Sequence, residues 1–305
     1  MTTTPALEPT VSSRPVVRLG ETVTGLVALT KPRIVELLVI TTVPTMFLAA
    51  HGVPPVGLIA ATVGGGAMSA GGANALNMVY DRDIDALMAR TEKRPLVTGV
   101  VSPLAAVIFA VLLEMAAFAV LWLEVNLLAA SITLAAAAFY LGVYTMWLKR
   151  STPHNIVIGG VAGAAPTLVA WAAVTGTLSA TAWGLFAVVT LWTPPHFWAL
   201  AFKYRDDYSA AHVPMLPSVA DTGKVTSQIL LYSLVLVAVS VGVVFVGPLG
   251  PLYAAGAGAL GIGFIARAWQ LRRHPNPKRA LALFGYSIVY LALLFVGVGV
   301  DALVR

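Results

Sequence analysis

The chain has 305 residues, of which 58% are hydrophobic and only 10% charged, and its mean hydropathy is +0.86. These values exclude an ordinary soluble globular protein and indicate a membrane protein. The net charge is +6, and the lack of cysteine excludes disulfides, thiolate metal sites and thiol nucleophiles.

The first 25 residues differ in composition from the rest of the chain. Pro5, Pro9 and Pro15 stand among Ser and Thr residues, and the segment lacks the compact apolar core and the cleavage site of a signal peptide. We therefore expect a flexible tail over residues 1–25 and a single transmembrane domain over residues 26–305.

Nine apolar runs follow, and a helix that crosses a bilayer needs about 20 residues. The runs lie near residues 34–50, 56–76, 104–123, 127–147, 156–175, 181–201, 227–247, 252–268 and 282–300. We predict from them an all-α, polytopic membrane protein with nine transmembrane helices.

The basic residues predict the orientation of these helices. The tail and the loops after the second, fourth, sixth and eighth runs hold 18 of the 19 Lys and Arg residues. Because cytoplasmic loops are enriched in Lys and Arg, we expect a cytoplasmic N-terminus and an external C-terminus in the cell (plasma) membrane. The basic groups are divided among short loops, so nucleic acid is not an expected partner.

Three oxygen-bearing side chains stand four residues apart where the second run ends. Asn77, Asp81 and Asp85 would lie on one face of a helix. Amide and carboxylate oxygens are the ligands that Mg²⁺ prefers, and Mg²⁺ often shares substrate phosphates. Basic residues that could bind such phosphates follow directly, namely Arg82, Arg90, Lys93 and Arg94. The segment predicts a metal–diphosphate site at the membrane surface.

Two other interpretations of this segment remain open. The acids could simply form ion pairs with the neighbouring basic residues in a solvated loop. Asp81, Asp83, Asp85 and Glu92 also match EF-hand positions, but Ala86 stands where that loop needs glycine. Acids so close to a bilayer tend to be functional, which favours the metal site.

The loop after the sixth run resembles the loop after the second, since both mix acidic and basic residues. It contains Lys203, Asp206 and Asp207, which could equally be a membrane anchor, and the shorter loop after the fourth run contains Lys149 and Arg150. The repeat every four runs suggests two four-helix units plus a ninth helix around a central cavity, with the substrate site between the units.

Ionisable and aromatic side chains also occur within the apolar runs. Glu36 and Glu114 are costly there unless paired, and His196 stands beside Pro194-Pro195, which should disturb the helix. His196 could be a hydrogen-bonded core residue or a metal ligand, and His154, at a loop–helix junction, is equally ambiguous. An aromatic belt or a cation-stabilising wall would explain Tyr140, Tyr144, Trp192, Phe197, Trp198, Tyr204 and Tyr208.

Five segments together resemble a known family. The Asn-x-x-x-Asp-x-x-x-Asp pattern from Asn77 to Asp85 resembles the first signature of intramembrane aromatic prenyltransferases. The other segments lie at residues 31–36, 81–95, 144–160 and 191–217. Together they resemble the protohaem IX farnesyltransferase (haem O synthase) family over about residues 22–300.

The resemblance implies transfer of the farnesyl group of farnesyl diphosphate to a vinyl group of haem B. Water addition would give haem O and diphosphate, for the maturation of haem-copper oxidases. The implied cofactor is Mg²⁺, and the implied partners are the lipid bilayer and the next enzyme of haem A synthesis. A prenyltransferase acting on a quinone precursor, or a transporter of an anionic amphiphile, is the alternative.

The resemblance also implies roles for particular residues. The implied catalytic residues are Asn77, Asp81, Asp85, Lys203 and Asp207. The implied diphosphate-binding residues are Arg90, Lys93, Arg94, Lys149 and Lys203, and the implied metal ligands are Asn77, Asp81, Asp85, Asp206 and Asp207. The haem-binding candidates are His196, Trp198 and His154. A second Asp-x-x-x-Asp is incomplete, because Ala211 stands four residues after Asp207.

Overall fold

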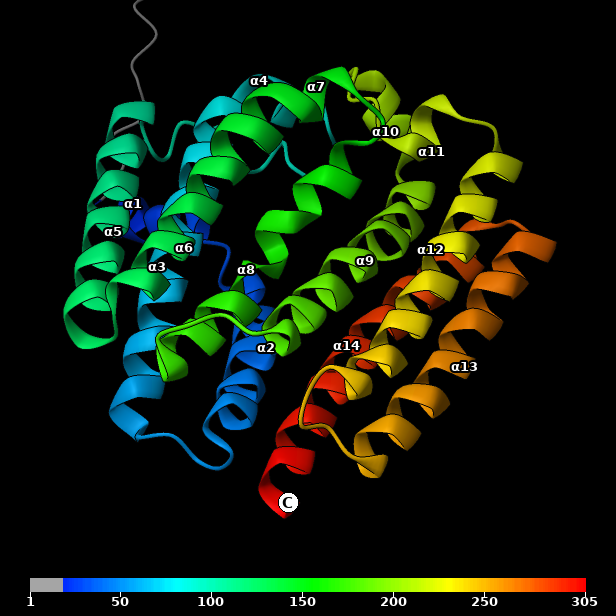
Figure 1. Ribbon diagram of the computed structural model, residues 1–305. Helices are drawn as coiled ribbons and strands as arrows, with labels where there is room; N and C mark the ends of the chain where they lie inside the picture. Colours follow the sequence, from blue (N-terminus) through cyan, green and yellow to red (C-terminus); the bar gives the residue numbers. More distant parts are fainter. Residues whose placement is uncertain (1–18) are drawn as a thin grey trace, which may run out of the picture.

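Helices account for all regular structure between residues 19 and 305, the part of the chain that this computed structural model describes (Figure 1). The elements are α1 Leu19–Leu29, α2 Pro32–Ala50, α3 Val56–Tyr80, α4 Arg82–Asp85, α5 Pro103–Glu124, α6 Leu127–Ala138, the π-helix η1 Phe139–Leu148, α7 Lys149–Ser151, α8 Asn155–Thr175, α9 Ala180–Lys203, α10 Arg205–Ala210, α11 Leu216–Val219, α12 Thr222–Gly242, the 3-10 helix η2 Val243–Phe245, α13 Pro251–Arg273 and α14 Pro277–Val304.

Eight helical segments are long and apolar enough to cross a membrane. They are Val56–Tyr80, Pro103–Glu124, Leu127–Ser151, Asn155–Thr175, Ala180–Lys203, Thr222–Phe245, Pro251–Arg273 and Pro277–Val304. These segments coincide with the second to ninth predicted runs. The first run coincides with α2, whose apolar part, Val35–Ala50, is shorter. The all-α membrane class is confirmed, whereas the count of nine spans and their arrangement around a cavity remain predictions.

Polar side chains begin five of these helices where the sequence leaves an apolar run. In each case a side-chain oxygen accepts a hydrogen bond from the backbone N–H three residues later, a cap that contributes about 1 kcal/mol. The capping residues are Ser102, Asn126, Ser179, Asp221 and Asn276. Prolines follow at the start of α5 and α14, where their missing N–H costs nothing.

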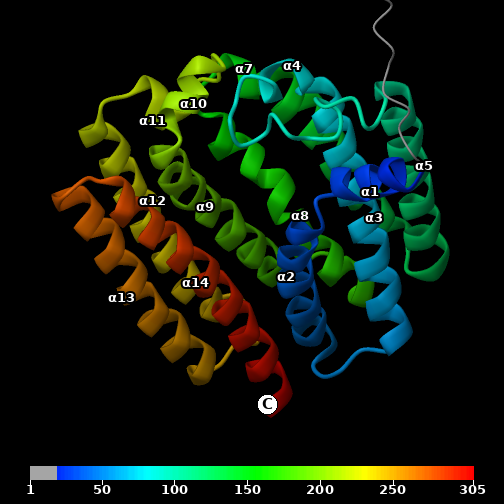
Figure 2. The same ribbon diagram turned by 180° about the vertical axis from the view of Figure 1, so that it is seen from behind.

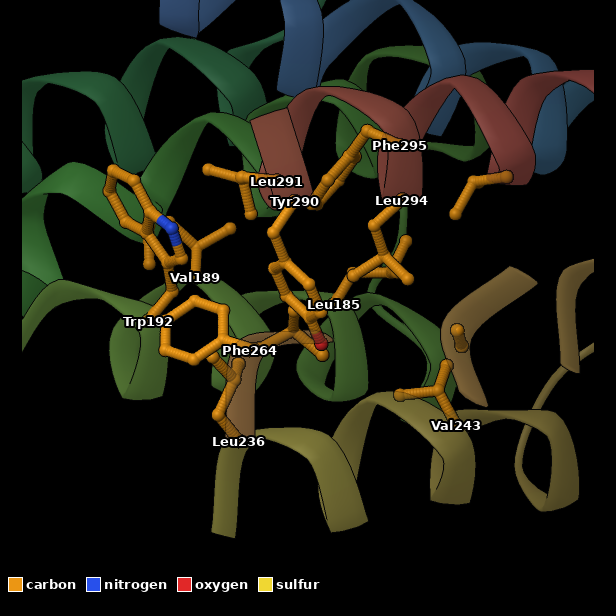
Figure 3. Close-up of a cluster of buried hydrophobic side chains, with 14 of the residues drawn as sticks. Leu185, Val189, Trp192, Leu236, Val243, Phe264, Tyr290, Leu291, Leu294 and Phe295 are labelled. Atoms are coloured by element: carbon orange, nitrogen blue, oxygen red, sulfur yellow. The ribbon is translucent and has the colours of Figure 1, made fainter. Parts of the chain in front are cut away.

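The largest hydrophobic cluster packs α9 against the C-terminal helices (Figure 3). Leu185, Val189 and Trp192 of α9 meet Tyr290, Leu291 and other residues of α14, with Leu236 of α12 and Phe264 of α13 beside them. Several polar atoms that this cluster buries have partners, whereas Trp198 Nε1 is buried without one. Trp192 Nε1 donates to the Ser287 carbonyl (2.7 Å), and the hydroxyls of Tyr253 and Tyr290 donate to Ser240.

The connecting segments that contain most of the charge gather at one end of the molecule. Figures 1 and 2 show α4, α7, α10 and α11 at this end, and the C-terminus of α14 at the opposite end. The two mixed-charge loops that the sequence relates to one another therefore lie at the same end of the molecule. Which end is cytoplasmic remains a prediction.

Helix α1 occupies part of the segment that the sequence assigned to a flexible tail. Residues 1–18 lie outside the described residues, but Leu19–Leu29 is helical, so the predicted boundary at residue 25 falls within a helix. In Figure 2, α1 lies crosswise to α3 and α5. Val23 and Val27, one turn apart, are both exposed, as expected of a helix at a membrane interface.

Candidate active site

The helical repeat of Asn77, Asp81 and Asp85 continues across the end of α3. The Asp81 N–H donates to the Asn77 carbonyl (2.9 Å), and the Asp85 N–H donates to the Asp81 carbonyl (2.8 Å). The backbone thus keeps the i, i+4 register from α3 into α4, as the spacing predicted. All three side chains are buried.

Asp81 is the most enclosed carboxylate of the group, with 0% of its surface exposed. Its Oδ2 accepts hydrogen bonds from Asn77 Nδ2 (2.7 Å) and from Lys149 Nζ. Its Oδ1 has no hydrogen-bond partner, and the nearest cation is Arg150, with an N–O separation of 3.6 Å. A buried carboxylate oxygen without a donor is costly, so this atom favours a bound cation.

Asp85 is held by the loop that follows it. Arg94 forms an ion pair with its carboxylate, and Thr91 Oγ1 donates to its carbonyl (2.8 Å). Asp85 therefore does pair with a neighbouring basic residue, as one of the open interpretations of this segment expects. Arg90 and Lys93 are exposed, and no carboxylate in residues 19–305 forms an ion pair with either.

Asp83 points away from Asp81 and Asp85, into solvent. Arg150 donates two hydrogen bonds of 2.7 Å to its carboxylate, and this contact lowers the pKa of Asp83 to about 2. Arg150 also donates to the Tyr80 carbonyl (3.1 Å) at the end of α3. Arg150 therefore ties α3 to the end of the fourth span.

The π-helix η1 brings the fourth span to the site. Thr145 Oγ1 accepts from Asn77 Nδ2 (3.1 Å), and Lys149 begins α7 one turn later. A π-helix of ten residues is unusual, and such segments are frequent at functional sites. A side chain at Gly159 of α8 would collide with the Tyr144 ring, so the π-helix η1 packs closely against α8 only because position 159 is a glycine.

Lys31 also belongs to the site, although the sequence did not assign it there. Its Nζ donates to Asn74 Oδ1 (3.1 Å) and to Asn77 Oδ1 (3.3 Å). Burial, together with the positive charges of Arg94 and Lys149, lowers the pKa of Lys31 to about 7. The signal available in the sequence was the Lys-Pro pair directly before the first apolar run.

The second mixed-charge loop lies beside the first without sharing its ion pairs. Lys203 is exposed above the Tyr204 ring, Asp206 is exposed beside Arg205, and Asp207 is half-buried. A small apolar cluster joins the two loops, formed by Ile84, Met88, Ile156, Ala201, Ala211, Val213 and Met215. A hollow of about 340 Å³ between the loops is lined by Asp83, Arg150, His212 and neighbouring residues.

The haem-binding candidates do not converge. His196 is buried between the rings of Trp192 (4.1 Å between centroids) and Phe284 (4.5 Å), and its Nδ1 contacts Ser287 Oγ at 2.6 Å. Trp198 lies in the same hydrophobic cluster, whereas His154 is exposed. For His196 the structure favours the packing role that the sequence had left open. Helix α9 continues through Pro194 and Pro195, so the two prolines do not end it.

The two intramembrane acids also differ. Glu114 accepts a hydrogen bond from Ser69 Oγ (2.8 Å) and so ties α5 to α3. Its other oxygen, Oε1, is buried without a hydrogen-bond partner. Glu36 of α2 is exposed. Ser69 is thus the interior partner that the position of Glu114 within an apolar run required.

The donor set at Asn77, Asp81 and Asp85 fits a hard divalent cation. It offers two carboxylates, of which Asp81 Oδ1 lacks a hydrogen-bond donor, and the amide oxygen of Asn77, which accepts from Lys31 and would have to exchange that hydrogen bond for the metal. Within residues 19–305, no three His, Asp or Glu side chains cluster as a complete metal site. A metal held here would therefore take further ligands from water or from a substrate phosphate.

A comparison with protein families decides the ancestry of this chain. Residues 38–295 match the model of the UbiA prenyltransferase family. The chain belongs to the UbiA prenyltransferase family. UbiA members are transferases by this name, and the resemblance seen in the sequence is confirmed.

Individual relatives agree with this assignment. A protoheme IX farnesyltransferase from Frankia casuarinae is 50% identical over 92% of this chain and 98% of its own length. A protein of the same name from Gloeobacter violaceus is 48% identical over 96% of each chain.

Solved structures of UbiA-like proteins show the same fold. A digeranylgeranylglyceryl phosphate synthase superposes with a TM-score of 0.76 at 18% identity, covering 93% of this chain and 100% of its own. A UbiA homolog from Archaeoglobus fulgidus, bound to DMAPP and Mg²⁺, superposes with a TM-score of 0.63 at 17% identity, covering 90% and 99%.

Proposed function

We propose that this membrane protein transfers the farnesyl group of farnesyl diphosphate to a vinyl group of haem B, giving haem O and diphosphate. One observation carries the proposal: over more than 90% of its length, the chain is 48–50% identical in sequence to proteins named protoheme IX farnesyltransferase. The buried carboxylate Asp81, with Asn77, Lys149 and Arg150 around it, supplies the chemistry that such a transfer needs.

Asn77, Asp81 and Asp85 are the residues that would hold Mg²⁺. The Archaeoglobus fulgidus homolog binds Mg²⁺ together with a prenyl diphosphate, which supports a metal in this fold. When bound, Mg²⁺ acts as a Lewis acid that stabilises the negative charge of the departing diphosphate.

The cations of the site would bind and orient the diphosphate. Lys149, Arg94 and Arg150 are already placed by their carboxylate partners, so little ordering is required when an anion arrives. Their N–H groups can form charge-assisted hydrogen bonds with phosphate oxygens. Arg90, Lys93 and Lys203 are exposed cations near the same end and could reach the outer phosphate.

The transfer breaks the C1–O bond of farnesyl diphosphate, the vinyl π bond and one O–H bond of water, and it forms one C–C bond and one C–O bond with release of a proton. The bond between the farnesyl C1 and the diphosphate oxygen breaks, and the electron pair leaves with diphosphate. The vinyl group of haem B then bonds to the allylic cation, which places the positive charge on the carbon beside the porphyrin. Water captures this carbon and loses a proton, giving the hydroxyethylfarnesyl group. Water must be kept from the allylic cation until the vinyl group has attacked it. The apolar cluster that contains Ile84 and Val213 lies at this end of the helices.

The second loop is proposed to face the same substrate. Lys203 ends α9, and Asp206 and Asp207 lie in α10, which follows it. The apolar cluster joins this loop to the first loop. A second metal ion there would need ligands that Ala211 does not supply. The proposed setting is the plasma membrane with these loops in the cytoplasm.

The test incubates membranes that contain the protein with farnesyl diphosphate, Mg²⁺ and either haem B or 4-hydroxybenzoate. We expect haem O by mass analysis with haem B and no prenylated product with 4-hydroxybenzoate. The Asp81→Asn variant is the matched control. Prenylation of 4-hydroxybenzoate alone would replace the proposal with a quinone-precursor enzyme, and no product with either acceptor would support a transporter.

A further inference from the structure

Lys31 stands apart from the other cations of the site in its electrostatic environment. Lys149 is paired with Asp81, Arg94 with Asp85, and Arg150 with Asp83. In residues 19–305, no carboxylate lies within ion-pair distance of Lys31. Its contacts are two amide oxygens, those of Asn74 and Asn77.

An ammonium group has three N–H donors, and two of those of Lys31 are in use. Amide oxygens bear only partial charge, so they solvate the ammonium without neutralising it. A partly buried cation without a counter-ion is unfavourable, and an anion that reached it would relieve this cost. The third donor, and the lack of a carboxylate within ion-pair distance of the amine, both favour an anionic ligand.

Asn77 connects Lys31 to the carboxylate that the site depends on. The Asn77 amide is fixed in one orientation, because its Nδ2 donates to Asp81 Oδ2 (2.7 Å) and to Thr145 Oγ1 (3.1 Å). Its Oδ1 must then face Lys31 (3.3 Å). Lys31 therefore reaches the same group of side chains as Lys149, from the opposite side of Asn77.

The backbone of Lys31 is held in a rare conformation that brings its side chain to this position. Its φ of 50° and ψ of 65° are left-handed, although Lys31 precedes Pro32 and is not glycine. A residue before proline prefers the extended region, so the surrounding structure has to impose this conformation. Such strained residues are typical of binding sites, and here the strain sits between α1 and α2.

We propose that Lys31 is a further diphosphate-binding residue, which neutralises substrate charge that the carboxylate-paired cations leave uncompensated. This inference rests on the proposed function, since it assigns a group to the same substrate. Lys31 also orients the amide of Asn77 in the absence of substrate. When diphosphate binds, the ammonium bonds to a phosphate oxygen through its free donor.

A purely structural role for Lys31 makes a different prediction. If Lys31 served only to hold Asn74 and Asn77, a neutral N–H donor would largely replace it. Gln at position 31 has N–H donors and no charge, although its amide nitrogen lies one atom nearer the backbone than the Lys31 Nζ. The Lys31→Gln variant therefore separates the charge from the hydrogen bonds, and Lys31→Arg retains both. Lys278→Met is the matched control, because Lys278 is exposed in the first turn of α14.

The experiment measures binding of farnesyl thiodiphosphate and of inorganic diphosphate to the purified full-length protein in nanodiscs with Mg²⁺. A hydrogen bond to a charged group contributes enough that we expect Lys31→Gln to weaken both affinities about tenfold or more. Lys31→Arg should stay within about threefold of the wild type, and Lys278→Met should not change. Thermal unfolding of each variant shows that the fold is retained.

The outcomes separate this inference from the proposed function. Wild-type binding and haem O formation with an unchanged Lys31→Gln affinity would overturn the role of Lys31 and leave the function intact. Failure of the wild type to bind farnesyl thiodiphosphate would overturn both. If Lys31→Gln lost stability while its remaining folded fraction bound both ligands normally, the role of Lys31 would be structural and the inference would be wrong.

Discussion

Lys149 at the end of the fourth span forms an ion pair with Asp81 at the end of α3, 68 residues earlier in the chain. Asp81 is wholly buried, so this contact is shielded from the solvent that weakens surface ion pairs. Removing either partner would leave a buried charge without compensation. The pair therefore fixes both the position of the carboxylate and the approach of two spans that form the candidate site.

Replacing Asp81 by Asn should lower the rate of haem O formation at least about 100-fold, because a neutral amide binds Mg²⁺ and orients Lys149 poorly. The measurement is product formation across a Mg²⁺ titration. Glu92→Gln is the control, because Glu92 is an exposed carboxylate of the same loop that forms no ion pair with the other described residues. Equal activity of wild type and Asp81→Asn at every Mg²⁺ concentration would remove Asp81 from the site.

Reporter tags placed after residues 92 and 150 should both be cytoplasmic. These positions follow Asp81 and Lys149, whose side chains form an ion pair. Figures 1 and 2 show α4 and α7 at the same end of the molecule. Tags after residues 53 and 178 should be external, because the connections there contain no Lys or Arg. Accessibility of each tag in sealed cells gives the answer. Tags 92 and 150 on opposite sides would contradict the contact of Asp81 with Lys149.

Replacing His196 by Ala should destabilise the protein by about 2–4 kcal/mol, since it empties the space between Trp192 and Phe284 and removes the contact with Ser287 Oγ. Thermal unfolding measures the loss, and His154→Ala, at an exposed position, should show none. A stable His196→Ala protein with a shifted absorption of bound haem would instead make His196 an iron ligand.

Asp301 near the C-terminus should be needed for the stability of the last two helices. Its carboxylate accepts from the N–H groups of Gly250 (2.7 Å) and Tyr253 (3.3 Å), and so it caps the start of α13 from α14. Asp301→Ala should cost about 2 kcal/mol and lower the melting temperature by about 5 °C. Asp301→Asn retains one acceptor and should lose less. An unchanged melting temperature for Asp301→Ala would show that solvent replaces the cap.

Local features of the chain were predictable because their causes lie within a few residues. Apolar runs of membrane-spanning length located the helices, and the residues Ser102, Asn126, Ser179, Asp221 and Asn276 mark helix starts through bonds to the backbone three residues on. The spacing of Asn77, Asp81 and Asp85 placed them on one face, and hydrogen bonds within the same helical turns maintain that face.

The partners of these residues were decided by the tertiary structure, since each contact joins segments far apart in the chain. Asp81 could have paired with any nearby cation, and the π-helix η1 determines that Lys149 reaches it. Lys31 reaches Asn74 and Asn77 through a left-handed backbone that a lysine before proline does not predict. His196 faces α14 because the packing of α9 buries that side. Spacing fixes the direction of a side chain along its own helix, but only the packing of helices decides what it meets there.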